Sequence, residues 1–255
     1  MLPTPDTSHV PYTRVYEPAE DSFLLLDTLS APSETAFLSS RFGGASSSRT
    51  APLIVEVGPG SGVVIAFLTA HAQTILGTRH VLACGVDVNR FACAATVGTA
   101  TKAIKEAGGS AGAGWFLDAV QGDLVTPLRA GVVDVLVFNP PYVPTDELPR
   151  VPVPVESEPA MTTFEEESQL LALSYAGGRD GMETTDRLLA ALPTALSARG
   201  CAYVLLCAQN RPDEVKERMR AMGGGWKAET VGTSGKHAGW EKLQIIRIWR
   251  AIRDA

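Results

Sequence analysis

The chain has 255 residues, with 22 Lys and Arg against 28 Asp and Glu, and therefore a formal net charge of −6. This length suits one large domain with a sizeable core. A composition of 45% hydrophobic and 20% charged residues is typical of a folded protein and excludes global disorder. The acidic balance argues against a protein that binds nucleic acid by itself, because such proteins attract phosphates through excess Lys and Arg.

No segment approaches the roughly 18 apolar residues that a membrane helix needs. Residues 1–12 are polar and proline-rich, so we expect neither secretion nor membrane insertion. The cysteines lie in apolar segments without Cys-x-x-Cys spacing, which favours reduced thiols in the core over disulfides or a metal site. They are Cys84, Cys93, Cys201 and Cys207. The sequence thus predicts a cytoplasmic protein, with the nucleus as a compatible second location, and no metal bound by this chain.

Hydrophobic patterns predict an alternation of helices and strands. In chain order they indicate a helix at 18–29, a strand at 53–57, a helix at 61–76, a strand at 81–86, a helix at 89–107, strands at 119–121 and 132–138, a helix at 183–198, a strand at 202–207 and a helix at 212–222. Pro18 and Pro212 are typical of a first helical turn, Asn89 is a predicted N-cap, and Pro193 predicts a kink. The strands lack polar alternation, as strands buried on both faces of a parallel sheet do.

Residues 226–231 and 243–249 depart from that alternation and predict an antiparallel pair at the end of the chain. We therefore expect an α/β fold, a doubly wound and mostly parallel seven-stranded sheet closed by a C-terminal antiparallel pair. One domain, 1–255, accounts for all elements. Two segments interrupt it: a flexible Gly- and Ser-rich insertion at about 42–51, and a long loop at about 143–167 on the substrate side, whose length is typical of functional or disordered segments.

A glycine-rich turn ends the first predicted strand. Glu56 stands two residues before Gly58, and Gly60 and Gly62 follow, which gives Gly-x-Gly-x-Gly. A dinucleotide site prefers Gly-x-Gly-x-x-Gly. The acidic residue here favours a ligand that carries an ammonium group, and S-adenosylmethionine fits this description. A purely structural turn is the alternative.

Acidic residues also end the next two strands. Asp87 can accept hydrogen bonds from both hydroxyls of an adenosine ribose, although it could instead cap the following helix. At Asp123 and Leu124, the carboxylate or the neighbouring amide can meet an adenine, although simple loop polarity explains this pair as well. The carboxyl ends of adjacent parallel strands meet at one edge of a sheet, so these residues are expected to share a ligand site.

Asn139-Pro140-Pro141-Tyr142 directly follows the strand at 132–138. An amide or exocyclic NH₂ group is a poor nucleophile because its lone pair is delocalised. The side-chain oxygen of Asn139 and the carbonyl of Pro140 can accept its two hydrogens and so aim the nitrogen at an electrophilic methyl group. Tyr142 offers a face for a planar substrate. A structural Pro-Pro turn is the alternative.

With these motifs the chain resembles the class I S-adenosylmethionine-dependent methyltransferases and, more narrowly, the HemK family of glutamine methyltransferases that modify translation release factors. The first matching segment, 16–26, is similar to the N-terminal signature of the short eukaryotic and archaeal branch, which lacks an extra substrate domain. The further matches are 56–62, Asp87, 139–142 and 176–181.

The resemblance implies a Rossmann-like fold and assigns roles to the matched residues. Asn139, Pro140 and Tyr142 hold the substrate glutamine as catalytic residues. The cofactor-binding residues are Tyr16, Glu20, Asp21, Glu56, Gly58, Gly60, Gly62, Asp87, Asp123, Leu124 and Asn139, of which the first three are expected at the methionine end. For Glu20 and Asp21 the alternative is charge complementarity to a helix dipole.

The resemblance also implies partners. The substrate is the Gly-Gly-Gln motif of a class I release factor, and a small zinc-binding activator completes a heterodimer, without sequence-specific binding to nucleic acid. An apolar segment at 115–120 could pair with that activator by strand addition, or could pack under its own helix. Alternative functions are an adenine-N6 methyltransferase on nucleic acid, a histone lysine methyltransferase, and a catalytically inactive scaffold subunit.

Overall fold

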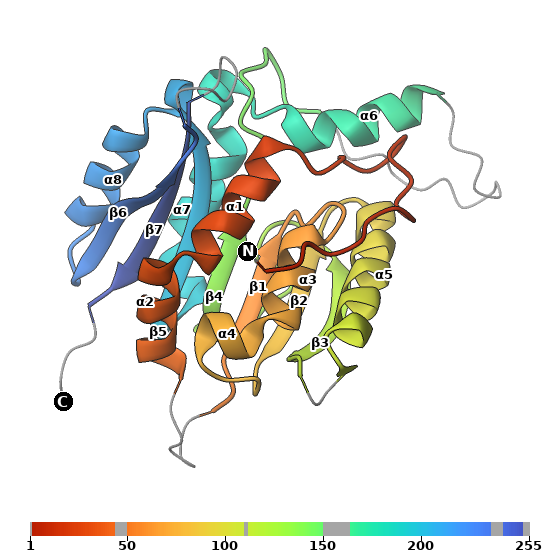
Figure 1. Ribbon diagram of the computed structural model, residues 1–255. Coiled ribbons are helices and arrows are strands. Elements are labelled where there is room, and N and C mark those ends of the chain that lie inside the picture. The colour runs from red at the N-terminus through yellow and green to blue at the C-terminus, as the bar shows by residue number, and fades with distance from the viewer. Residues whose placement is uncertain (1, 44–49, 110–111, 150–163, 236–241, 252–255) are drawn as a thin grey trace.

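A computed structural model describes residues 2–43, 50–109, 112–149, 164–235 and 242–251 (Figure 1). Its strands form one seven-stranded sheet in the order β3-β2-β1-β4-β5-β7-β6. They are β1 (Leu53–Val57), β2 (Leu82–Asp87), β3 (Trp115–Gln121), β4 (Val133–Phe138), β5 (Leu196–Cys207), β6 (Trp226–Thr233) and β7 (Leu243–Arg250). Only β7 runs antiparallel to its neighbours, β5 and β6, so the predicted fold class is confirmed.

Helices cover both faces of this sheet (Figure 1). They are α1 (Glu20–Ser30), α2 (Pro32–Phe42), α3 (Val63–Ala70), α4 (Ala72–Leu76), α5 (Arg90–Glu106), α6 (Phe164–Tyr175), α7 (Glu183–Ala195) and α8 (Pro212–Ala221). Successive side chains of β4 point to opposite faces of the sheet and pack in different cores. Val135 and Val137 pack against α1 to α4, whereas Leu136 and Phe138 belong to the core under α7 and α8. Within the described residues no helix is long and apolar enough to cross a membrane.

Three predicted helix boundaries are wrong. α1 begins at Glu20 and not at 18, because Ala19 is extended (φ −129°, ψ −163°). The helix predicted at 61–76 is divided at His71 into α3 and α4. α7 ends at Ala195, because Leu196 already pairs with Val133 and begins a long β5.

Two helices were not predicted. α2 follows α1 after one residue, with Pro32 in its first turn. α6 begins at Phe164 inside the segment predicted as a loop to 167, and residues 150–163 of that loop lie outside the described residues. The same holds for residues 44–49 of the predicted insertion, whose first residue, Phe42, ends α2.

Candidate active site

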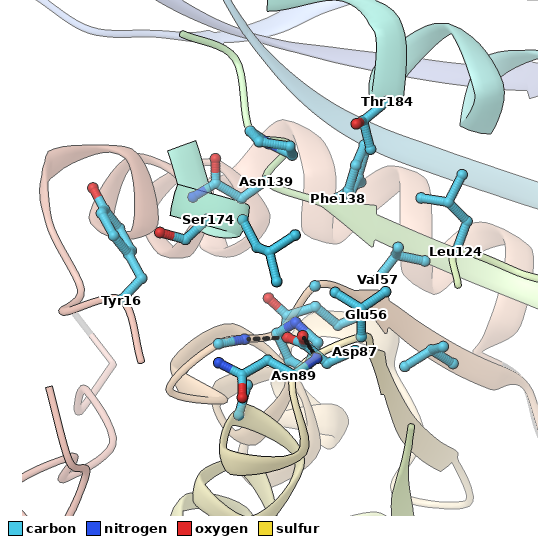
Figure 2. A pocket seen from close by; sticks show the side chains of 18 of the residues that line it. Tyr16, Glu56, Val57, Asp87, Asn89, Leu124, Phe138, Asn139, Ser174 and Thr184 are labelled. Atoms are coloured by element: carbon cyan, nitrogen blue, oxygen red, sulfur yellow. Dashed lines mark hydrogen bonds between the residues drawn. The ribbon is translucent and has the colours of Figure 1, made fainter. Parts of the chain in front are cut away.

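A pocket opens at the carboxyl ends of β1, β2 and β4, beneath α6. The strand order reverses at β1, which is where open α/β sheets bind their ligands. Figure 2 shows Glu56, Asp87 and Asn89 grouped on one side of this pocket and Asn139 with Ser174 on another. The predicted site residues in its wall are Tyr16, Glu56, Gly58, Gly60, Asp87, Asp123, Leu124 and Asn139.

Glu56 and Asp87 form the acidic floor of the pocket. Glu56 is 2% exposed, and its Oε2 accepts the Ile65 N–H at 2.7 Å, so it also caps α3, which lacks a capping side chain of its own. Asp87 accepts from the Gly60 N–H at 3.2 Å through Oδ2 and from the Asn89 N–H at 2.8 Å through Oδ1. These hydrogen bonds fix both carboxylates in place at the pocket. The helix α5 is capped by the Asn89 side chain and not by Asp87, so the capping alternative for Asp87 is wrong.

Burial raises the pKa of both carboxyl groups, to about 8 for Glu56, where Asp87 adds to the effect, and to about 6 for Asp87. The folded protein therefore keeps protons that the unfolded chain releases. Between the ordinary pKa values, near 4, and about 8, the free energy of unfolding of the free protein is expected to fall as pH rises.

The free protein favours the protonated form of these two carboxyl groups, whereas a cationic ligand favours the ionised form. We predict that the affinity for S-adenosylmethionine rises with pH up to about 8, and that binding releases protons. Between about pH 6 and 8, where Glu56 alone titrates, the rise is at most about tenfold per pH unit. Calorimetric titration in buffers of different ionisation enthalpy measures both. Glu56→Gln keeps an oxygen for the Ile65 N–H but cannot ionise, so it should flatten the profile near pH 8. An unaltered profile in this variant would contradict the assignment.

Gly58 and Gly60 bring the backbone to the pocket with φ of 61° and 55°. Gly62 instead allows two helices to pack closely. A Cβ at this position would lie 2.6 Å from the Thr96 Cα, so Gly62 lets α3 approach α5, and it does not line the pocket.

Asp123 lies at the pocket mouth, where its carboxylate forms an ion pair with Arg187 of α7. Leu124 beside it is buried and has a left-handed backbone, with φ of 51°, which places its side chain in the wall. The apolar sides come from Leu124, Phe138 and Val57.

Asn139 follows β4, and the two polar atoms of its side chain have different surroundings. Its Nδ2 donates to Oδ2 of Asp21 at 2.9 Å, and Oδ1 of the same carboxylate accepts the Ser22 N–H at 2.6 Å. Asp21 is 4% exposed. Among the described residues, Oδ1 of Asn139 is buried without a hydrogen-bond partner. Because Asp21 holds the NH₂ group, the oxygen is the atom left to accept a hydrogen from a ligand.

The remaining predicted residues lie outside the wall. Asp21 acts on Asn139, as described, and does not itself line the pocket. Glu20 is exposed in the first turn of α1. Pro140 is buried and does not line the pocket, while Tyr142 packs against the core beneath α1 to α4.

Two parts of the wall extend beyond the predicted site residues. α6 contributes Leu170, Leu173 and Ser174 from above. The N-terminal segment contributes Val15 beside Tyr16, and it is held there by the Asn89 Nδ2, which donates to the Arg14 carbonyl at 2.7 Å. The helical character of 164–175 is the available signal for α6, and the matching segment 16–26 is the signal for the N-terminal segment, although it does not include Val15.

The donor set of this pocket fits S-adenosylmethionine. Glu56 offers a carboxylate for a cationic group, Asp87 retains lone pairs for two hydroxyls, and the apolar sides suit a flat purine. Fold and pocket together define a class I S-adenosylmethionine-dependent methyltransferase.

Comparisons with known proteins narrow this class. Methyltransferase HEMK2 of Mus musculus is 35% identical over 251 residues, 96% of this chain and 96% of that protein. The eRF1 methyltransferase catalytic subunit mtq2 of Schizosaccharomyces pombe is 32% identical over 98% of this chain and 96% of that protein. The chain belongs to the HemK family of methyltransferases.

A solved structure agrees at the level of the fold. It is the Mtq2–Trm112 complex of E. cuniculi, responsible for methylation of the eRF1 termination factor, with a TM-score of 0.55 and 22% identity over 93% of this chain and 99% of that chain. No family model matches the sequence.

Proposed function

We propose that this enzyme methylates the side-chain amide nitrogen of the glutamine in the Gly-Gly-Gln motif of a class I release factor. The carrying observation is the buried Oδ1 of Asn139, a residue of the pocket wall whose NH₂ group is held by Asp21. A glutamine NH₂ group can donate to this oxygen, and the Pro140 carbonyl remains the predicted second acceptor. S-adenosylmethionine supplies the electrophilic methyl group. Accepting the N–H hydrogens turns the nitrogen toward it, and the extra proton can leave after transfer.

The relative of S. pombe that matches nearly the whole chain is named an eRF1 methyltransferase catalytic subunit, which supports this substrate. Transfer of a radioactive methyl group to a recombinant release factor tests it. Label is expected in the intact factor and not in a factor whose motif reads Gly-Gly-Ala. The same assay with DNA, RNA and histones as substrates tests the alternative functions. An exocyclic adenine amine, like a glutamine amide, could donate to both the Asn139 side-chain oxygen and the Pro140 carbonyl. Label in nucleic acid alone would overturn the proposal.

We further propose that a small zinc-binding activator docks on β3, the edge strand of the sheet. Trp115, Leu117 and Val120 are 49%, 57% and 42% exposed there. The described connection from β3 to β4, residues 122–132, contains no helix that could cover them. An exposed apolar edge suits strand addition by a second chain, and the E. cuniculi relative was solved in a complex with Trm112. We assign the heterodimer to the cytoplasm, without sequence-specific nucleic-acid binding.

Co-expression tests this docking surface. The chain alone is expected to aggregate, and the activator to restore solubility and copurify with it. Leu117→Asp should abolish copurification. Met222→Asp, which places the same charge at the exposed apolar residue that follows α8, should not. Retention of the activator by Leu117→Asp would refute docking on β3.

A further inference from the structure

The segment Gly177-Gly178-Arg179-Asp180-Gly181 connects α6 to α7 and does not line the cofactor pocket. It belongs to the matched motif at 176–181, yet the site described above gives it no role. It lies directly behind the Asn-Pro-Pro-Tyr segment, Asn139–Tyr142, and its contacts there are made by the backbone.

Those contacts leave no room for side chains. A Cβ on Gly177 would overlap the carbonyl oxygen of Pro141, and one on Gly181 would overlap the carbonyl oxygen of Tyr142. Gly181 also has φ of 67°, which disfavours any other residue. The glycines therefore let residues 177–181 support the carbonyl groups that follow Asn139 and Pro140.

Hydrogen bonds fasten the two segments together. The Val143 N–H donates to the Tyr175 carbonyl at 2.9 Å, and the Gly177 N–H donates to the Val143 carbonyl at 2.8 Å. Further along, the Thr145 N–H donates to the Gly178 carbonyl at 3.0 Å, and its Oγ1 accepts the Gly178 N–H at 3.0 Å. The chain beyond Tyr142 is thus hydrogen-bonded to residues 175–178 at four points.

One side chain joins this pair of segments to the sheet. Asn210, in the turn after β5, is 2% exposed. Its Nδ2 donates to the carbonyls of Tyr142 and Asp180, both at 3.1 Å. Its Oδ1 accepts the Cys207 N–H at 2.8 Å at the end of β5. Nδ2 also lies 3.4 Å from the Gly181 carbonyl, so one amide binds backbone groups from three parts of the chain.

The backbone on either side of this contact is strained. Asp180 has φ of 57° and Arg211, next to Asn210, has φ of 51°, and neither is a glycine. Non-glycine residues persist in this region only where the surrounding structure enforces it, and they cluster at functional sites.

We propose that Asn210 is a positioning residue for methyl transfer. By holding the Tyr142 carbonyl against residues 177–181, its amide sets where the Asn-Pro-Pro-Tyr segment stands over the pocket, and with it the Oδ1 of Asn139. A displacement of about 1 Å at a reacting centre costs on the order of 100-fold in rate. This inference rests on the proposed function of Asn139 as acceptor of the substrate amide.

The substitution Asn210→Asp separates the two halves of this side chain. An aspartate keeps an oxygen for the Cys207 N–H, but the ionised carboxylate has no hydrogen for the Tyr142 and Asp180 carbonyls. We expect kcat to fall about 10- to 100-fold while Kd for S-adenosylmethionine stays within about twofold. Hydrogen–deuterium exchange at the Val143 and Thr145 amides should become faster, and this readout is independent of activity.

A pH profile adds a readout that a merely structural role would not move. Protonation of Asp at position 210 restores one donor, so the ratio of variant to wild-type kcat should rise as pH falls. Gln209→Asp is the matched control, because it places the same charge on the exposed neighbouring residue, and it should behave as wild type. If Asn210→Asp proves unfolded by its melting curve, Thr145→Val removes the Oγ1 contact to Gly178 from the same clamp. It should lower kcat a few-fold at unchanged Kd.

The inference is overturned if a folded Asn210→Asp keeps wild-type kcat and exchange rates, or if kcat and cofactor affinity fall together. Failure of the proposed function looks different. In that case the wild type leaves the release factor unlabelled, whereas the exchange rates still report whether Asn210 clamps the segment.

Discussion

Asn139→Ala is expected to lower the rate of methyl transfer about 10²- to 10³-fold, the loss typical of removing one preorganised hydrogen-bonding group from an active site. The substitution deletes the Oδ1 that is buried at the pocket without a partner among the described residues. The cofactor floor, formed by Glu56 and Asp87, is left intact. Single-turnover transfer to the release factor measures the rate of the chemical step.

Cofactor affinity of the same variant is the internal control. Calorimetry should give Kd for S-adenosylmethionine within about threefold of wild type, which corresponds to less than about 1 kcal/mol. If affinity and rate fell by the same factor, Asn139 would be part of the pocket structure and not the acceptor of the substrate amide.

The sequence predicts which residues of the proposed cofactor half lie together, because its signals are local. Glu56, Gly58 and Gly60 stand within five residues at the end of β1, and Asp87 ends β2. The parallel sheet then places both strand ends at one edge, which the alternation of strands and helices already implied. The same local signal does not show that Gly62 lies outside the pocket wall, because its close contact is with Thr96, on a helix that the turn itself does not specify.

The substrate half depends on pairings between distant parts of the chain. Asp21 and Asn139 are 118 residues apart, and only the packing of α1 near the end of β4 joins them. Arg14 and Glu167, 153 residues apart, likewise tie the N-terminal segment to α6 across the pocket. No periodicity or turn signal encodes such a contact. The acidic residues at the start of α1 therefore looked like either cofactor ligands or helix-dipole charges, and the structure gives Asp21 a third role.

Because Asp21 holds the Asn139 amide, the substitution Asp21→Asn is expected to lower kcat strongly. The carboxylate now accepts from both the Ser22 N–H and the Asn139 Nδ2. An amide at position 21 has one oxygen, so it loses one of these contacts or turns the Asn139 amide over. Turning it over points an NH₂ group at the substrate amide, where an acceptor is required. We expect kcat to fall about 10- to 100-fold, with the variant folded because size and burial are preserved.

Asp27→Asn, on the exposed side of α1, removes the same charge from the same helix and should leave kcat unchanged. Cofactor affinity separates the competing roles, since an Asp21 that bound the methionine end would raise Kd as it lowered kcat. A double-mutant cycle makes the test quantitative. If Asp21 acts through Asn139, adding Asp21→Asn to Asn139→Ala costs nothing further in rate. Additive losses would show that the two residues act separately.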